Sequence, residues 1–285
     1  MAAIGVIGGS GLYEIEGLES VEYKDVDTPW GRPSDSYVTG TLNGIKMVFL
    51  PRHGRGHKIM PTDINYRANI YGMKSLGVDR IISVSAVGSM KEEITPGDVV
   101  LPDQFIDFTK NRDTSFFGEG VVAHVSMADP VCPLLCGALY DVLKKMDAKV
   151  HKGGTYFCIE GPQFSSKSES NLFRSWGVDV IGMTNMPEAK LAREAEICYS
   201  TLALSTDYDC WHDGHDNVTV EDVIKILLQN TELAKEIIKN VVSELSSVKS
   251  CNCARSLQNA IITQPDAIDT EIKDKYRLLI GKYIK

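Results

Sequence analysis

The sequence predicts an α/β protein with one central mixed sheet flanked by helices, forming a single domain over residues 1–285. Short apolar runs alternate with longer segments of helical periodicity, a pattern typical of a sheet covered by helices. The chain has 285 residues, 43% hydrophobic and 24% charged, which is enough for one sizeable core. No Pro-, Ser- or Gly-rich linker, internal repeat or low-complexity tract divides it.

The individual elements follow from these apolar periods and from the turn residues between them. Strands are predicted over residues 3–7, 46–50, 80–84, 98–101, 149–158, 178–181 and 197–204. Helices are predicted over residues 63–74, 133–145, 167–176, 187–196 and 219 to about 245. Thr219-Val220-Glu221-Asp222 resembles a capping box for the last of these, with Asp where Glu is usual. A closing helix over residues 269–283 belongs to a helical carboxyl-terminal segment that starts at about residue 267.

Charge and hydropathy exclude several classes of partner. The net charge of −8 and the pI of about 5.3 argue against nucleic-acid or membrane-surface binding, which needs a basic face. No run reaches the ~18 apolar residues of a membrane span, and the amino terminus lacks the basic leader of a signal peptide. We therefore expect a cytoplasmic protein, with an additional nuclear location left open.

The cysteine content gives no clear framework. The seven cysteines are an odd number, and a chain of this length without a secretion signal is not expected to be held by disulfides. Cys251 and Cys253 are the one close pair. Two thiols alone do not make a metal site, so we predict no metal, and the pair is either incidental or redox-labile.

The most informative polar pattern follows the apolar run at 197–204. It contains Asp207 and Asp209, interleaved with the aromatic residues Tyr208 and Trp211. Residues two apart on a strand point to the same side, so both carboxylates can face one ligand. Such a pair suits a flat, nitrogen-rich heterocycle, with one Asp protonated as an acid and the other accepting from an amino group. A polar strand end running into a turn is an equally good interpretation of this segment alone.

Two loops after predicted strands have the composition of anion-binding loops. Gly8-Gly9-Ser10-Gly11 can bring main-chain amides and a hydroxyl to a phosphate, and a plain tight turn is the alternative. It matches neither the dinucleotide fingerprint nor the P-loop. Arg52-His53-Gly54-Arg55-Gly56-His57 offers guanidinium forks and protonated imidazole donors, so for this loop we favour anion binding over a solvated basic loop.

Other segments are less specific candidates. Residues 83–89 end a strand in small side chains, which either reach the same anion or make room for helix packing. Phe164 can stack on a base and Met183 can cover a sugar face, although both residue types are also common in cores. His124 lies between apolar neighbours and is more simply a buried or interface histidine than a catalytic one. Most of these segments follow strands, where α/β sheets bind ligands.

Several motifs, taken in order along the chain, resemble the trimeric purine nucleoside phosphorylase family, and within it the branch that acts on 5′-methylthioadenosine. They are Ile7-Gly8-Gly9-Ser10-Gly11-Leu12, Arg52-His53-Gly54, Ile159-Glu160-Gly161-Pro162-Gln163-Phe164-Ser165-Ser166 and residues 205–211. The resemblance runs from Ile4 to about Ile262.

The resemblance implies a role for each matched position. Phosphate would be held by Ser10, Arg52, His53, Ser85 and Thr184. The base and ribose would be lined by Ala86, Phe164, Gly182, Met183 and Asp209. The 5′-methylthio group would be enclosed by Val220, Val223, Ile224 and His124, the last reaching across a subunit boundary of a homotrimer. Asp207 would be the catalytic residue, donating a proton to purine N7, and Asp209 would engage the 6-amino group.

The implied reaction is phosphate-dependent cleavage of 5′-methylthioadenosine to adenine and 5-methylthioribose 1-phosphate, with phosphate as co-substrate and no metal or organic cofactor. Family members acting on 6-oxopurines carry Glu and Asn where this chain has Ser165 and Asp207. A carboxylate accepts from an amino group but repels a carbonyl oxygen, so these residues favour adenine. Gly182 stands where asparagine is frequent in the methylthioadenosine branch. The alternatives are a broader nucleoside phosphorylase acting on adenosine or 6-oxopurine nucleosides, a hydrolytic nucleosidase, and a non-catalytic nucleotide-binding module.

Overall fold

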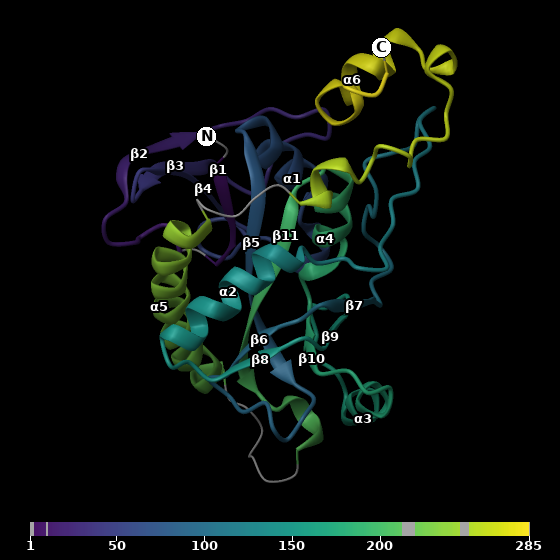
Figure 1. Cartoon of the computed structure of the whole chain (residues 1–285). Helices are drawn as coiled ribbons and strands as arrows, with labels where there is room; N and C mark the ends of the chain where they lie inside the picture. Colours follow the sequence, from purple (N-terminus) through teal and green to yellow (C-terminus); the bar gives the residue numbers. More distant parts are fainter. Residues whose placement is uncertain (1–2, 10, 213–219, 246–250, 285) are drawn as a thin grey trace.

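The computed structural model describes residues 3–9, 11–212, 220–245 and 251–284, and its strands form one mixed sheet (Figure 1). The described strands are β1 (Ala3–Gly8), β2 (Glu19–Lys24), β3 (Tyr37–Leu42), β4 (Ile45–Pro51), β5 (Val78–Ser89), β6 (Val99–Leu101), β7 (Gln104–Asp107), β8 (Val150–Lys152), β9 (Thr155–Cys158), β10 (Val180–Gly182) and β11 (Cys198–Asp207). The α-helices are α1 (Tyr66–Ser75), α2 (Pro133–Lys145), α3 (Lys167–Ser175), α4 (Asn185–Glu194), α5 (Val220–Leu245) and α6 (Thr270–Ile280). Short 3₁₀ turns are η1 (Pro61–Asp63), η2 (Asp209–Trp211), η3 (Asn252–Arg255) and η4 (Pro265–Ala267).

The centre of the sheet is β5, which pairs in parallel with β1 on one side and β11 on the other. The main strand order is β2-β3-β4-β1-β5-β10-β9-β7, while β11 also pairs with β6, and β6 with β8. The β5–β10 and β6–β11 pairs are antiparallel, which makes the sheet mixed, as predicted. The carboxyl ends of β1, β5 and β11 therefore meet at one edge of the sheet.

Helices cover both faces of the sheet, as Figure 1 shows, and each face has its own hydrophobic core. Leu202 and Leu204 of β11 belong to the core that α2 and α5 cover. Tyr199 and Ala203 of the same strand belong to the core that contains α1 and α4. This alternation explains why β11 is an unbroken apolar run: both of its faces are buried.

Capping groups set several helix boundaries. Helix α1 begins at Tyr66, later than the predicted residue 63, because the Asn65 side chain accepts the main-chain N–H of Ala68. Helix α3 has a reciprocal capping box between Ser166 and Glu169. The closing helix is found within its predicted range.

The structure also corrects some strand predictions. The predicted strand 149–158 is two strands, since β8 pairs with β6 whereas β9 pairs with β10 and β7. Strands β2, β3 and β7 were not predicted. Every residue of β2 is exposed at the sheet edge, so it carries no buried face for the sequence to reveal. Among the described residues, no helix is long and apolar enough to cross a membrane.

Candidate active site

The two aspartates at the end of β11 lie together, but the reason differs from the prediction. Strand β11 ends at Asp207, and Asp209 lies in η2 with a φ of 49°, a left-handed conformation that Asp tolerates. This turn lets the Asp209 main-chain N–H donate to Asp207 Oδ1 at 2.8 Å. The carboxylates are therefore brought together by a turn and not by the alternation of a strand.

Neighbouring elements hold this turn against the sheet. Trp211 donates from Nε1 to the Ser89 carbonyl oxygen at 2.8 Å, and the Arg174 guanidinium lies 3.8 Å from its ring centroid. A Cβ on Gly88 would meet Asp207 Oδ1 at 3.1 Å and Asp209 Cβ at 3.3 Å. Glycine at position 88 therefore leaves the space that the two aspartates occupy.

The environment of the two carboxylates is different. Thr206 donates to Asp207 Oδ2 at 2.6 Å, and Ser170 of α3 donates to Asp209 Oδ2. Burial and the like charge of Asp207 raise the pKa of Asp209, although the Ser170 hydrogen bond opposes the change. The proton that such a coupled pair retains belongs to both carboxyls, so the raised pKa of Asp209 does not by itself decide which of the two is the acid.

The loop before α3 brings Ser165 to the same turn. Cys210 Sγ lies 3.2 Å from the Ser165 carbonyl oxygen. The buried Ser165 Oγ has no hydrogen-bond partner among the described residues. A buried hydroxyl without a partner is costly, so this position is suited to a polar ligand atom.

Two predicted phosphate-binding hydroxyls come together on the sheet. Ser85 Oγ of β5 lies 3.2 Å from Thr184 Oγ1, which precedes α4, and 3.1 Å from the Tyr156 hydroxyl of β9. Burial raises the pKa of Tyr156 to about 12, which keeps its hydroxyl protonated. Ala86, the next residue of β5, is exposed between buried neighbours, so this part of the central strand is open to a ligand.

Tyr156 also accounts for the glycine at position 182. A Cβ on Gly182 would lie 2.0 Å from the Tyr156 hydroxyl oxygen. The asparagine expected at this position from the family resemblance would therefore collide with a fully buried tyrosine. Sequence reasoning missed Tyr156, because an aromatic residue within a strand is ordinarily a core residue.

Arg52 is placed at the site, but its charge is already paired. Its guanidinium forms a bidentate ion pair with Glu188 of α4, with Nε–Oε2 at 2.7 Å and Nη2–Oε1 at 3.0 Å. It also donates to Ser83 and to the carbonyl oxygens of Ile7 and Val84. Burial opposes the positive charge, but Glu188 outweighs it and the pKa of Arg52 is raised. Arg52 thus joins the ends of β1, β4 and β5 to α4, and sequence reasoning gave no sign of Glu188.

His53 differs from the protonated donor that the sequence suggested. Burial lowers its pKa to about 4, although a hydrogen bond to the Ile59 carbonyl oxygen opposes the change. Because that oxygen can only accept, Nδ1 carries the hydrogen, and Nε2 of the neutral ring is an acceptor. No described residue accepts the main-chain N–H of His53, so this N–H is available as a donor.

A second buried arginine positions the loop that carries Phe164. Arg112 Nε donates to Glu160 Oε1 at 2.9 Å, and Nη1 donates to the Met183 carbonyl oxygen at 2.7 Å. Main-chain N–H groups of Lys110 and Asn111 help to lower the pKa of Glu160 to about 2, against the effect of burial. Arg112 lies in a polar loop with no motif, so the sequence gave no reason to single it out.

The remaining predicted site residues are less completely defined. Phe164 is 79% exposed. His124 is exposed and donates its main-chain N–H to the Ala260 carbonyl oxygen. Ser10 lies outside the described residues. The same holds for three side chains at the start of helix α5, those of Val220, Val223 and Ile224.

Comparison with known proteins identifies the class to which this fold and site belong. The model of the phosphorylase superfamily matches residues 3–243. The chain belongs to the phosphorylase superfamily.

Full-length relatives narrow the comparison. The chain is 61% identical to a Geobacter sulfurreducens protein named S-methyl-5′-thioadenosine phosphorylase, over 99% of each chain. It is similar to a methylthioadenosine phosphorylase from an antarctic soil metagenomic library, with a TM-score of 0.94, 48% identity and 98% of each chain covered. It is also similar to a Schistosoma mansoni methylthioadenosine phosphorylase in complex with tubercidin, with a TM-score of 0.84, 33% identity and 90% and 96% coverage.

Proposed function

We propose that this chain cleaves 5′-methylthioadenosine with phosphate, giving adenine and 5-methylthioribose 1-phosphate. The bond between C1′ and purine N9 breaks, and a phosphate oxygen forms the new bond to C1′. Asp207 donates a proton to purine N7, so the base leaves as a neutral molecule. Phosphate is a co-substrate, and the proposed reaction uses no metal or organic cofactor.

The pair Asp207 and Asp209 beside Ser165 carries this proposal. A carboxylate accepts from the 6-amino group of adenine, and the small Ser165 leaves room for it without a competing acidic side chain. The hydroxyls of Ser85, Thr184 and Tyr156 lie within hydrogen-bond distance of one another and would supply donors for phosphate. The names of the full-length relatives point to the same substrate.

The phosphate contacts that we propose follow the local geometry. Ser85 and Thr184 contribute hydroxyls, and His53 contributes its main-chain N–H. Arg52 orders the strand ends through Glu188 and adds only a partly neutralised charge. Ser10 completes the anion site from the loop after β1. We assign the base and ribose walls to Ala86, Phe164, Gly182 and Met183.

The homotrimer is a proposal that rests on the family resemblance, and it concerns the 5′ end of the substrate. We propose that His124 reaches a neighbouring subunit's site, while Val220, Val223 and Ile224 line the subunit's own site. Val122 and Ile262, close to His124 along a β-bridge region, are 47% and 61% exposed, as is common for subunit interfaces. Light scattering should give about three times the 31.4 kDa chain mass.

The test is an absorbance assay with methylthioadenosine, adenosine and inosine, each with and without phosphate. We expect cleavage of methylthioadenosine that depends on phosphate. Undiminished turnover in phosphate-free buffer would identify a hydrolytic nucleosidase instead. Binding without cleavage in either buffer would identify a non-catalytic module.

The acid role of Asp207 has its own test. Asp207→Asn should lose at least about 10–100-fold in kcat/KM for methylthioadenosine, that is ~1.4–2.7 kcal/mol of transition-state stabilisation. Equal rates for the variant and the parent would remove Asp207 from the mechanism. Asp79→Asn is a control, because this carboxylate pairs with Arg80 near the start of β5, at the opposite end of that strand from Ser85.

A further inference from the structure

Four cysteine thiols converge at the opposite end of β11 from the aspartate pair. The Sγ atoms of Cys132, Cys198, Cys251 and Cys253 all lie within 4.8 Å of one another. Cys132 precedes α2, Cys198 is the first residue of β11, and the other two flank Asn252 at the start of η3. The prediction of no metal considered Cys251 and Cys253 alone, whereas the fold adds two thiols from positions distant in sequence.

The sulfur spacing matches the geometry of a single tetrahedral ion. Four sulfur atoms at ~2.3 Å from one zinc ion lie about 3.8 Å apart. Cys251 Sγ lies 3.7 Å from Cys132 Sγ and 3.0 Å from Cys198 Sγ. Shifts of less than ~1 Å would bring these sulfurs to the zinc-bound spacing. All four cysteines are free thiols in this structure, and both of these distances exceed the ~2.05 Å of a disulfide bond.

The surroundings suit the charge that such a site would carry. Arg193 Nη1 lies 3.9 Å from Cys253 Sγ, and no described carboxylate forms an ion pair with Arg193. Cys132 stands at the amino end of α2, where the helix dipole favours a thiolate. Both features would stabilise a zinc tetrathiolate, whose net charge is −2.

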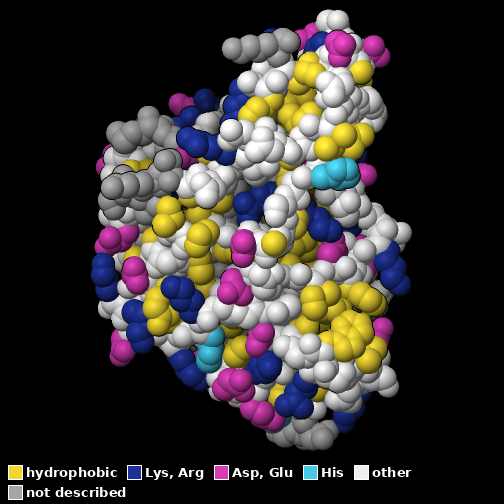
Figure 2. All heavy atoms as spheres, turned by 45° about the vertical axis from the view of Figure 1, so that its right-hand side comes forward, with side chains coloured by type: hydrophobic (Ala, Val, Ile, Leu, Met, Phe, Trp, Pro, Cys, Tyr) yellow, Lys and Arg dark blue, Asp and Glu magenta, His cyan; other side chains and the backbone are white. Residues whose placement is uncertain are grey.

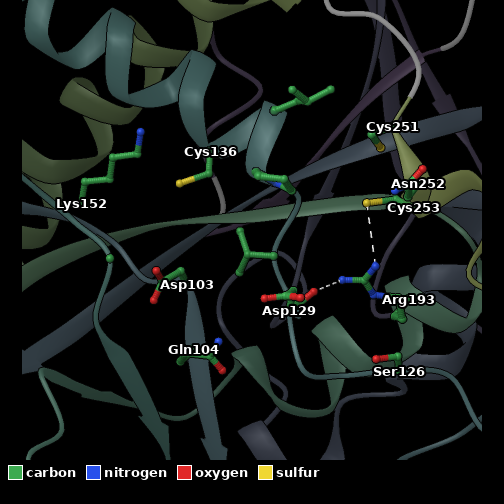
Figure 3. A pocket seen from close by; sticks show the side chains of 14 residues that line it. Asp103, Gln104, Ser126, Asp129, Cys136, Lys152, Arg193, Cys251, Asn252 and Cys253 are labelled. Atoms are coloured by element: carbon green, nitrogen blue, oxygen red, sulfur yellow. Dashed lines mark hydrogen bonds between the residues drawn. The ribbon is translucent and has the colours of Figure 1, made fainter.

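An ion can reach this cluster from solvent. Cys251, Cys253 and Arg193 lie at one end of a cavity of about 720 Å³, which Figure 3 shows from close by. Figure 2 shows the packed side chains of one face of the molecule, coloured by type. Cys198 and Cys251 are half-buried, whereas Cys132 and Cys253 are buried. Cys136 lines the same cavity but does not belong to the cluster.

We propose that Cys132, Cys198, Cys251 and Cys253 bind one zinc ion as a structural tetrathiolate site. Each thiol releases its proton to solvent as the ion binds, so four protons leave for each zinc. All four positions are protein ligands, which is typical of structural rather than catalytic zinc. The ten residues of β11 separate the cluster from Asp207 by ~30 Å, so the ion takes no part in the phosphorolysis proposed above. Its effect would be to attach the segment after α5 to the sheet.

The experiment measures zinc in the full chain, purified without a polyhistidine tag and with a thiol reductant. Plasma mass spectrometry should find about one zinc per chain, and the reduced apoprotein should take up one equivalent of added Zn²⁺. Binding should protect four thiols from a thiol reagent. Removal of zinc with a chelator should lower the Tm without abolishing phosphorolysis at low temperature.

Matched alanine variants distinguish the cluster from other cysteines. Cys253→Ala and the half-buried Cys251→Ala should each lose stoichiometric zinc, whereas Cys136→Ala should retain it. Circular dichroism checks that each variant is folded, and cobalt substitution gives a direct reading of tetrahedral thiolate coordination in the parent. Failure of the reduced parent to bind Zn²⁺ would overturn the proposal. So would disulfides among these four cysteines that persist when zinc is supplied under reducing conditions.

Discussion

The buried ion pair between Arg52 and Glu188 allows a quantitative prediction. The two side chains are 3% and 1% exposed, and Glu188→Gln removes one of the two charges while keeping the shape. Loss of one partner leaves the other charge buried and unpaired, which typically costs about 3–5 kcal/mol. Arg52 keeps its bonds to Ser83 and to two carbonyl oxygens, so we expect about 3 kcal/mol, the lower end of that range.

Urea denaturation measures this free energy of unfolding, and an exposed ion pair provides the control. Lys145 and Glu244 also lie 2.7 Å apart, but their side chains are 65% and 49% exposed. Glu244→Gln should therefore cost less than about 1 kcal/mol, because water screens the charges. If Glu188→Gln costs no more than Glu244→Gln, the buried charge of Arg52 does not need Glu188 as its partner, and the reasoning about this ion pair fails.

Two further predictions concern other buried groups. Gly182→Ala should raise the KM for phosphate by at least about tenfold, that is ~1.4 kcal/mol, because the added Cβ would displace the Tyr156 hydroxyl from Ser85. An unchanged KM for phosphate in the phosphorolysis assay would contradict this prediction. Burial raises the pKa of Glu194 from 4.5 to about 7, so the folded state holds a proton that the unfolded state releases. The contribution of Glu194 to stability therefore falls by up to about 3 kcal/mol as the pH rises from about 4.5 to 7. Glu194→Gln should flatten this part of the curve of Tm against pH. Parallel curves for the variant and the parent would refute this prediction.

The sequence was sufficient for most of the layered fold, because the relevant signals are local. The alternation of apolar runs and helical periods predicted β1, β4, β11 and α2, since each element must bury its own apolar face. The edge strand β2 has no buried face and was not predicted. The residue types at the strand ends likewise predicted the Asp207–Asp209 pair and the Ser85 hydroxyl, because polar side chains that directly follow a buried strand are a local signal.

Tertiary structure decided which groups these residues meet. Arg52 and Glu188 are 136 residues apart, and no local pattern relates them, so only the packing of α4 on the strand ends revealed that this arginine is already paired. The same holds for Tyr156 filling the space beside Gly182, and for Asp209 reaching Asp207 through a turn. The four cysteines are the clearest case: the sequence presented one close pair, and the fold joined it to Cys132 and Cys198. Local sequence patterns specify secondary structure and chemical type, whereas charge pairing, exclusion of space and ligand number depend on contacts that form only when distant segments pack together.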